Sequence, residues 1–127
     1  MNDQERYDIG LSKRRSTVGE AYVEKTLQAL NSVNEDFQSL VTRYVWGEVW
    51  SRPGIEEPTR RLLTLTMLIA LNRNDEFELH VRSALEHGLD IELLKEMVLQ
   101  VAIYAGIPAA NTAMRILCRV AEDLAIV

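Results

Sequence analysis

Residues 58–71 read PTRRLLTLTMLIAL, and this stretch decides the fold class because it is apolar on every side after Arg61. A helix that lacks a polar face belongs in the middle of a bundle or between subunits. Pro58 suits the first turn of such a helix, where its missing N–H would have no intrahelical partner in any case. The nearly apolar part, residues 62–71, is about half as long as the ~20 residues that span a bilayer. The stretch therefore predicts a buried core helix.

The sequence before this stretch predicts two more helices. Residues 3–30 are expected to form the first, with a break near Gly19. The second begins at Ser32 or Asn34, because Ser32 with Glu35 three residues later matches a capping box. A Ser-Arg-Pro-Gly turn ends this second helix. Its apolar residues recur at helical spacing, at Phe37, Leu40, Val41, Tyr44 and Val45.

The sequence after the central stretch predicts three helices. Asn74 or Asp75 is expected to cap one that runs through His87, with Gly88 directly after its end. Asp90 is expected to cap the next, which runs to Tyr104, and the last follows a Gly-Ile-Pro sequence and continues to the C-terminus. The core face of the helix after Asp90 is expected to be Ile91, Leu94, Val98 and Val101. No segment alternates between apolar and polar residues for long enough to form a sheet, so we expect an all-α, single-domain bundle of about six helices.

The composition is that of an ordinary soluble globular protein, with 47% apolar residues, 26% charged residues and a net charge of −5. The N-terminal sequence is charged and has no apolar core, so we expect no signal peptide. The Lys13-Arg14-Arg15 cluster is too small for a nucleic-acid-binding face, and we expect neither nucleic acid nor membrane as a partner. The single cysteine, Cys118, lies in an apolar helix where we expect it to be buried. One free thiol fits a reducing compartment, and we expect a cytoplasmic protein.

Glu76 and His80 are the first candidates for chemistry. They stand four residues apart, which places both on one face of a helix, where the carboxylate can hydrogen-bond the imidazole. Such a contact would fix the tautomer and raise the basicity of His80. Pairs of this kind are also common on exposed helices, so a surface pair without a catalytic role stays open. His87 precedes a helix-ending glycine, where a partly positive ring suits the helix dipole, and we interpret it as structural.

A second group of candidates lies in residues 43–54, RYVWGEVWSRPG, which hold both tryptophans, two arginines and a glutamate around a helix end. Trp46 and Trp50 predict either a core or oligomer contact or the wall of a pocket. Arg60 and Arg61 stand at a helix start, where their charge opposes the helix dipole, so they have either another purpose or none. No metal-ligand spacing, glycine-rich phosphate loop or nucleophile elbow occurs. Any chemistry is therefore expected to be acid–base and electrostatic.

Three stretches of the sequence resemble the carboxymuconolactone decarboxylase family. They are the N-terminal pattern RYDIG at 6–10 with Arg14-Arg15 and Val18-Gly19, then WGEVWSRPG at 46–54 followed by PTRR at 58–61, and VAIYAGIPAAN at 101–111. The resemblance keeps its order and spacing over most of the chain. It implies an alkylhydroperoxidase-like helical domain over residues 1–127 and a closed homo-oligomer, commonly a hexamer.

One departure from the wider superfamily bears on the chemistry. Alkylhydroperoxidase-like members carry a Cys-x-x-Cys pair followed four residues later by a histidine. Here Arg73 and Glu76 occupy the two cysteine positions, while His80 keeps the histidine position. Thiol redox chemistry needs a thiolate and a resolving partner, which these residues do not supply. The departure argues against a peroxidase and for the decarboxylase branch, with Glu76 and His80 in its active site.

The resemblance implies a lyase that decarboxylates 4-carboxymuconolactone to the enol-lactone of β-ketoadipate, in the protocatechuate branch of bacterial aromatic degradation. The substrate is an unsaturated lactone with two carboxylates, and its own carbonyl group accepts the electrons released with CO2, so no cofactor and no metal are expected. His80 is expected to donate to the developing oxyanion or to return the proton, with Glu76 orienting it and Glu48 or Tyr104 as the next candidate proton donors.

Arginines are the candidates for binding the substrate, because a guanidinium meets a carboxylate with two charge-assisted hydrogen bonds. The candidate substrate-binding residues are Arg43, Arg52, Arg60, Arg61 and Arg73, together with Trp46 and Tyr104. Two other functions stay open. The scaffold can carry a related decarboxylase or isomerase that acts on another lactone or keto acid. The chain can instead be a helical oligomer without activity, for which an exposed Glu76–His80 pair is expected rather than a pocket that holds the pair with an arginine.

Overall fold

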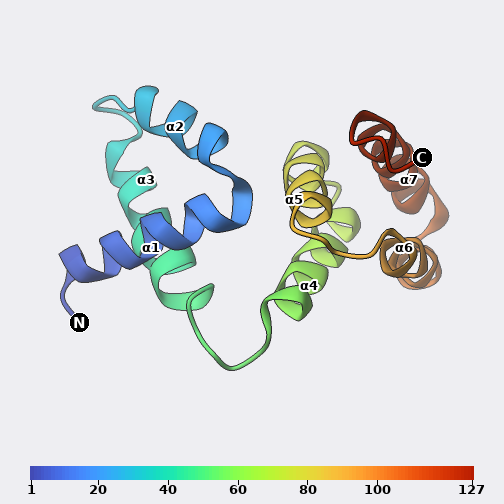
Figure 1. Ribbon diagram of the computed structural model, residues 1–127, viewed down its shortest axis with the longest axis horizontal. Helices are drawn as coiled ribbons and strands as arrows, with labels where there is room; N and C mark the ends of the chain where they lie inside the picture. The colour runs from blue at the N-terminus through green and yellow to red at the C-terminus, as the bar shows by residue number, and fades with distance from the viewer. The chain divides into compact units, whose positions relative to one another are not determined.

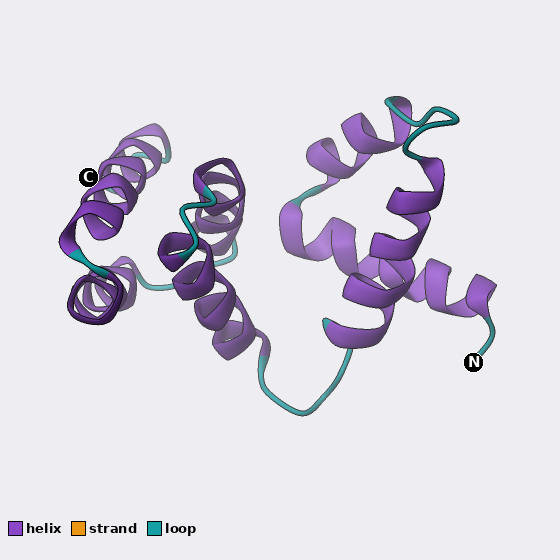
Figure 2. Ribbon diagram, turned by 180° about the vertical axis from the view of Figure 1, so that it is seen from behind, coloured by secondary structure: helices purple, strands orange, loops and turns teal.

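The computed structural model describes residues 1–127, and every regular element in it is a helix (Figure 1). The elements are α1 (Asp3–Val18), α2 (Glu20–Gln28), α3 (Glu35–Leu40), the π-helix η1 (Val41–Val49), α4 (Glu57–Ala70), α5 (Asn74–Glu86), α6 (Ile91–Ala105) and α7 (Ile107–Asp123). Loops and turns join them without a strand (Figure 2), which confirms the predicted all-α class. Contacts divide the chain into two compact units, residues 1–57 and 58–127.

The first unit has more helices than the sequence predicted. Gly19 separates α1 from α2 with a φ of 100°, as the predicted break requires, because glycine adopts this backbone conformation without strain. The second predicted helix consists of α3 followed without a gap by η1. At the end of η1 the backbone N–H of Trp50 donates to the Val45 carbonyl oxygen at 2.9 Å, five residues back instead of four. The Ser51 hydroxyl donates to the Trp46 carbonyl oxygen at 2.7 Å and so satisfies an acceptor at this helix end.

The start of α3 differs from the predicted capping box. The helix begins directly after Asn34, one of the two predicted starts, but the Ser32 side chain caps nothing. Instead, the Asn31 side-chain oxygen accepts hydrogen bonds from the backbone N–H groups of Val33 at 2.8 Å and Asn34 at 3.2 Å. The Ser32 prediction is wrong because the Glu35 N–H donates to the Asn31 carbonyl oxygen at 3.0 Å and the Asn34 N–H to the Asn31 side chain, which leaves Ser32 neither donor of the first turn.

The backbones of α1 and η1 touch where two glycines meet the opposite helix. A Cβ at Gly10 would overlap the Thr42 carbonyl group, and a Cβ at Gly47 would overlap the Arg6 carbonyl oxygen. Neither position therefore has room for a side chain. This close approach of two helices sets how the first unit packs.

Arg14 joins the same two segments from inside the first unit. Its side chain is buried, and its Nη1 donates to Gln38 Oε1 at 3.0 Å and to Thr42 Oγ1 at 3.3 Å. Burial lowers the pKa of Arg14, while the neighbouring tyrosines oppose the shift. The guanidinium thus fixes α1 against the start of η1 through neutral partners.

The second unit builds its core from one face of each of its helices. The core residues include Leu65, Ile69, Phe77, Val81, Ala84, Leu94, Val98, Val101, Ala113, Ile116, Leu117 and Val120. The predicted core face of α6 is confirmed, with Ile91 packed only partly against the core. The predicted caps also form, because the Asp90 side chain accepts from the Glu92 N–H at 2.9 Å and Gly88 has a φ of 89°. Helix α5 begins one residue earlier than predicted, directly after Arg73.

Several apolar side chains are exposed on the single chain, including one side of the central helix, which the sequence predicted to lie in the middle of a bundle or between subunits. On α4, Leu65 and Ile69 enter the core, whereas the opposite side is uncovered. The exposed apolar residues gather on α3 and η1 (Phe37, Leu40, Tyr44, Val45, Val49), on α4 (Leu63, Met67) and on α6 and the start of α7 (Leu99, Ile103, Tyr104, Ile107). Apolar residues that gather on one side of a helix are typical of a surface that another protein or another copy of the chain covers.

Cys118 lies exposed on α7, so the prediction that it is buried is wrong. The buried side of α7 instead passes through Leu117, and the next residue along the helix falls on the outer side. None of the helices combines the length and the apolar character that crossing a bilayer requires.

Candidate active site

Helix α5 carries the candidate catalytic histidine on a side that is only partly covered. The helix packs into the core through Phe77, Val81 and Ala84. Glu76 and His80 lie one turn apart on an adjacent side of the helix. The His80 side chain is half-buried, whereas Glu76 is exposed. The helix therefore presents one ring to a partly dry environment and one carboxylate to solvent.

The surroundings of His80 favour its neutral form. Burial lowers the pKa of His80 from its ordinary value of 6.5 to about 4, and the positive charge of Arg61 lowers it as well. The negative charge of Glu76 acts in the opposite direction but is the smallest of the three influences. At neutral pH the ring is therefore uncharged, with one nitrogen as a donor and the other as an acceptor.

Glu76 acts on His80 through its charge and not through a hydrogen bond. No hydrogen bond or ion pair joins the two side chains, although they stand one turn apart. The expected hydrogen bond is therefore absent from this structure. An exposed glutamate chain loses side-chain freedom on forming such a bond, which opposes its formation.

Among the candidate arginines, Arg61 is the one whose charge lowers the pKa of His80. Its side chain is 4% exposed, and Nη1 lies 3.5 Å from the Ser83 hydroxyl oxygen on α5. Ser83 is equally buried and also lies near His87, whose Nδ1 is 2.7 Å from the Ser83 carbonyl oxygen. The structure thus combines a buried cation with a half-buried imidazole whose neutral form that cation favours.

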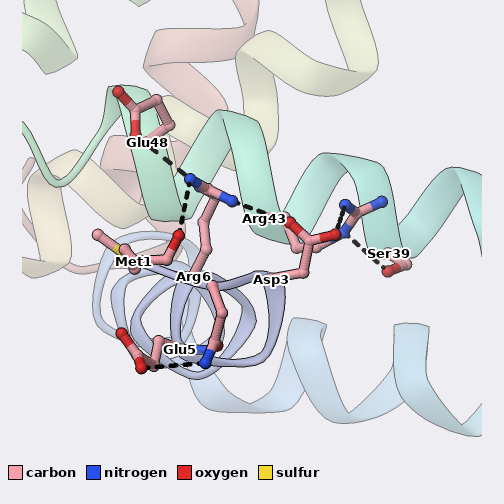
Figure 3. A network of polar contacts seen from close by, with 8 residues as sticks. Met1, Asp3, Glu5, Arg6, Ser39, Arg43 and Glu48 are labelled. Atoms are coloured by element: carbon pink, nitrogen blue, oxygen red, sulfur yellow. Dashed lines mark hydrogen bonds and ion pairs between the residues drawn. The ribbon is translucent and has the colours of Figure 1, made fainter.

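The other arginine-rich cluster lies in the first unit, where α1 meets η1 (Figure 3). Arg6 forms an ion pair with Asp3 at 2.9 Å and reaches Glu48 at 3.9 Å, and Arg43 forms an ion pair with Asp3 at 3.1 Å. The guanidinium groups of Arg6 and Arg43 lie 5.2 and 5.4 Å from the ring centre of Tyr44. Arg43 and Glu48, both sequence candidates, are therefore engaged in a network that ties down the N-terminal helix.

Two further candidates of the first unit belong to the same helix end. Arg52 lies 3.5 Å from Glu48, with its side chain 62% exposed. Trp46 and Trp50 are both buried, and their ring centres are 5.0 Å apart with a tilt of 31°. The tryptophan pair thus forms part of the interior of the chain, one of the two interpretations that the sequence left open.

The remaining candidates of the second unit come from three different places in its helices. Arg73 is exposed at the start of α5, and Arg60 is half-buried on α4. Tyr104 is 84% exposed and lines a groove between α4 and α6 together with Met67 and Gln100. The structure therefore brings together His80, Arg61 and Glu76 from the sequence candidates of this unit.

Sequence reasoning missed Ser83, which stands three residues after His80 and four before His87. That spacing places a hydroxyl between two imidazoles on one helix, and it was the only signal in the sequence. The contact of Ser83 with Arg61 joins two helices, so only the structure could reveal it. No group of three or more histidine, cysteine, aspartate or glutamate side chains is arranged to hold a metal ion.

Comparison with known proteins relates the chain to decarboxylases. Residues 35–118 match the model of the carboxymuconolactone decarboxylase family. The chain is 45% identical over 126 residues to the 4-carboxymuconolactone decarboxylase of Acinetobacter baylyi, covering 99% of this chain and 94% of that protein. It is 34% identical over 118 residues to the nitrosuccinic acid decarboxylase of Metarhizium robertsii, covering 93% of this chain and 82% of that protein. A 4-carboxymuconolactone decarboxylase of Pseudomonas putida is 40% identical over 48 residues, covering 38% of this chain and 100% of that sequence.

Proposed function

Because the chain belongs to the carboxymuconolactone decarboxylase family, we propose that it decarboxylates 4-carboxymuconolactone to the enol-lactone of β-ketoadipate. The observation that carries this proposal is the 45% identity to the Acinetobacter baylyi enzyme over nearly the full length of both chains. The reaction is a carbon–carbon lyase reaction of the protocatechuate branch of aromatic degradation. We also propose that the protein works in the cytoplasm.

The chemistry makes three demands on the protein. The bond between the ring carbon and its carboxylate breaks, CO2 leaves, and the electron pair moves through the ring double bond onto the lactone carbonyl oxygen. A proton then adds to carbon to give the product. The enzyme must hold a dianion, stabilise the oxyanion and allow a proton to arrive, and none of these steps requires an added electron acceptor.

His80 suits the second demand. Its ring is neutral at pH 7, because its pKa lies at about 4, so an imidazolium that could act as a general acid is scarce. A neutral ring still donates one N–H, and a fixed donor aimed at a developing oxyanion is worth about 3–4 kcal/mol in the transition state. We therefore assign His80 the role of oxyanion donor, with Glu76 influencing it through charge. The proton that reaches carbon then comes from water or from another side chain, for which Glu48 and Tyr104 are the candidates.

Arg61 suits the first demand. Its guanidinium is buried beside His80, so a substrate carboxylate bound to it brings the lactone within reach of the same ring. The half-buried ring with an adjacent arginine favours a catalytic site over an inactive helical oligomer, although Glu76 itself is exposed. Arg43, Arg52, Arg60 and Arg73 remain candidates for the second carboxylate.

The apolar faces of the single chain favour a closed homo-oligomer, and we propose a hexamer. Exposed residues such as Met67 on α4 and Ile103 on α6 are 56% and 79% exposed. Burying them between copies of the chain removes apolar surface from water, at about 25 cal/mol per Å².

A second substrate is favoured by the match to the nitrosuccinic acid decarboxylase. Nitrosuccinate, like the lactone, carries two carboxylates and a group that accepts electrons from the carbon that loses CO2. The lower identity makes it the alternative, together with other lactones and keto acids.

The deciding experiment is an ultraviolet assay with freshly generated 4-carboxymuconolactone, run beside nitrosuccinate at equal concentration. We expect turnover of the lactone that is unchanged by EDTA and by Cys118→Ser, since the proposed steps use neither a metal nor the thiol. Faster turnover of nitrosuccinate would establish the alternative. Failure to turn over either compound would refute the decarboxylase proposal, and loss of turnover with EDTA would refute its metal-free form.

A further inference from the structure

Arg61 and Ser83 form a buried polar contact between two helices. Arg61 lies on α4 and Ser83 on α5, and each side chain is only 4% exposed. Arg61 Nη1 donates toward Ser83 Oγ at 3.5 Å. A buried guanidinium has few chances to exchange such a partner for water, so the contact restricts where its charge can lie.

The position of the His87 ring indicates that the Ser83 hydroxyl oxygen acts as a hydrogen-bond acceptor. His87 Nδ1 lies 2.7 Å from the Ser83 carbonyl oxygen, and a carbonyl oxygen only accepts, so Nδ1 carries the hydrogen. The same N–H lies 3.4 Å from Ser83 Oγ. Ser83 Oγ therefore accepts toward both neighbours, with Arg61 on one side and His87 on the other.

We propose that Ser83 is a positioning residue, which holds the Arg61 guanidinium beside His80 so that it can receive a carboxylate of the substrate. Ser83 touches no substrate itself and acts through Arg61. The inference rests on the proposed function, since it assumes that Arg61 binds a carboxylate there. Its physical basis is preorganisation, because a guanidinium already held in place loses less freedom when the substrate arrives.

The first test is the kinetics of Ser83→Ala. We expect the Michaelis constant for 4-carboxymuconolactone to rise about tenfold, as loss of a hydrogen bond to a charged group implies, with turnover changed much less. Ser83→Cys, which has a similar volume and a weak acceptor, serves as the second variant if Ser83→Ala does not fold. The matched control is Thr112→Ala, which removes a hydroxyl that lies 3.4 Å from Arg115 Nη2 on the exposed side of α7. The control is expected to leave both constants unchanged.

The second test separates positioning from a general effect on the fold. In a background with Arg61→Met, Ser83→Ala should change the Michaelis constant by less than about twofold, because the residue through which it acts is gone. Losses that simply multiply in the two backgrounds would overturn the proposal.

The third test needs no substrate. Burial is the main cause of the lowered pKa of His80 and the charge of Arg61 the second, so a guanidinium that loses its contact with Ser83 and moves away should let that pKa rise while the effect of burial remains. The imidazole NMR signals during a pH titration report this rise. Thr112→Ala should leave the titration unchanged. A His80 titration that is identical in Ser83→Ala and the wild type would refute the proposal even in an active enzyme. An inactive wild type that shows the shift would refute the decarboxylase function, while still showing that Ser83 determines where the Arg61 charge lies.

Discussion

His80 combines a half-buried ring with a nearby arginine, and this combination predicts how the reaction responds when the ring is removed. His80→Ala should lower turnover about 10²–10³-fold with a small change in the Michaelis constant, because an oxyanion donor acts mainly in the transition state. Glu76→Gln should cost less, since Glu76 influences the ring only through its charge. Steady-state kinetics of both variants, with circular dichroism as the control for folding, test this. Near-full turnover of a folded His80→Ala protein would return His80 to a structural role.

The same ring predicts a dependence of stability on pH. The native pKa of His80 is about 4 and the ordinary value, taken for the unfolded chain, is 6.5. Between these two values the unfolded chain binds more protons than the native protein, so the stability contributed by His80 rises with pH and levels off above about 6.5. Urea unfolding at several pH values should show this rise in the wild type and a smaller rise in His80→Gln. Equal pH dependence in the two proteins would contradict the lowered pKa.

At the scale of single residues, the sequence predicted partners that are close along the chain and missed those that are not. The spacing of Glu76 and His80 correctly placed them one turn apart. It did not reveal that Glu76 stays in solvent and makes no hydrogen bond, because side-chain freedom and burial depend on neighbouring helices. Arg61 was one of five equivalent arginines in the sequence, and only its burial next to α5 distinguishes it.

The two glycines between α1 and η1 carry a prediction about the helices themselves. Gly10→Ala should destabilise the protein by about 1–3 kcal/mol or more, because the added methyl group meets the backbone of η1 and the helices must separate. Gly54→Ala is the matched control, since a Cβ there meets nothing within 4 Å. Its effect should be close to zero or slightly stabilising. Chemical denaturation of both variants measures the difference, and equal midpoints would show that the helices do not touch in solution.

At the scale of the helices, the sequence predicted a helix boundary well where a single glycine or capping residue determines it. Gly19, Gly88 and Asp90 lie at the predicted ends and starts. The π-helix η1 was not predicted, because its apolar residues recur at a spacing that an α-helix also has, while its contact with α1 at Gly10 and Gly47 and the Ser51 hydrogen bond are visible only in the structure. Ser32 failed as a cap because Asn31, through its carbonyl oxygen and its side chain, accepts from the N–H groups that Ser32 would have capped.

The molecule as a whole carries apolar faces that predict assembly. Ile103→Glu should weaken the homo-oligomer, because Ile103 is 79% exposed on α6 and a charge there would be buried between copies. Val33→Glu is the control, as Val33 is 90% exposed but lies in a loop away from the helical faces. Light scattering at micromolar concentration should show an oligomer for the wild type and the control and smaller species for Ile103→Glu. A wild type that runs only as a 14.5 kDa species would refute assembly.

Sequence patterns predicted that the whole molecule is all-α. Which apolar residues are exposed could be seen only in the structure. A helix that is apolar on every side belongs either in a bundle or between subunits, and the pattern alone does not separate the two. The structure shows that α4 buries one side within its own unit and leaves Leu63 and Met67 outside. Cys118 was misplaced for the same reason, since a residue next to a buried one on a helix can face either way. The single domain over residues 1–127 stays a prediction.

Because α4 and α6 carry uncovered apolar faces, the stability of the folded chain is expected to depend on the protein concentration. If the native chain assembles and the unfolded chain does not, mass action adds to stability as the concentration rises. For a hexamer, a tenfold dilution removes ~1 kcal/mol per chain. The melting temperature would then fall on dilution, and activity per subunit would decline in assays run with very little enzyme.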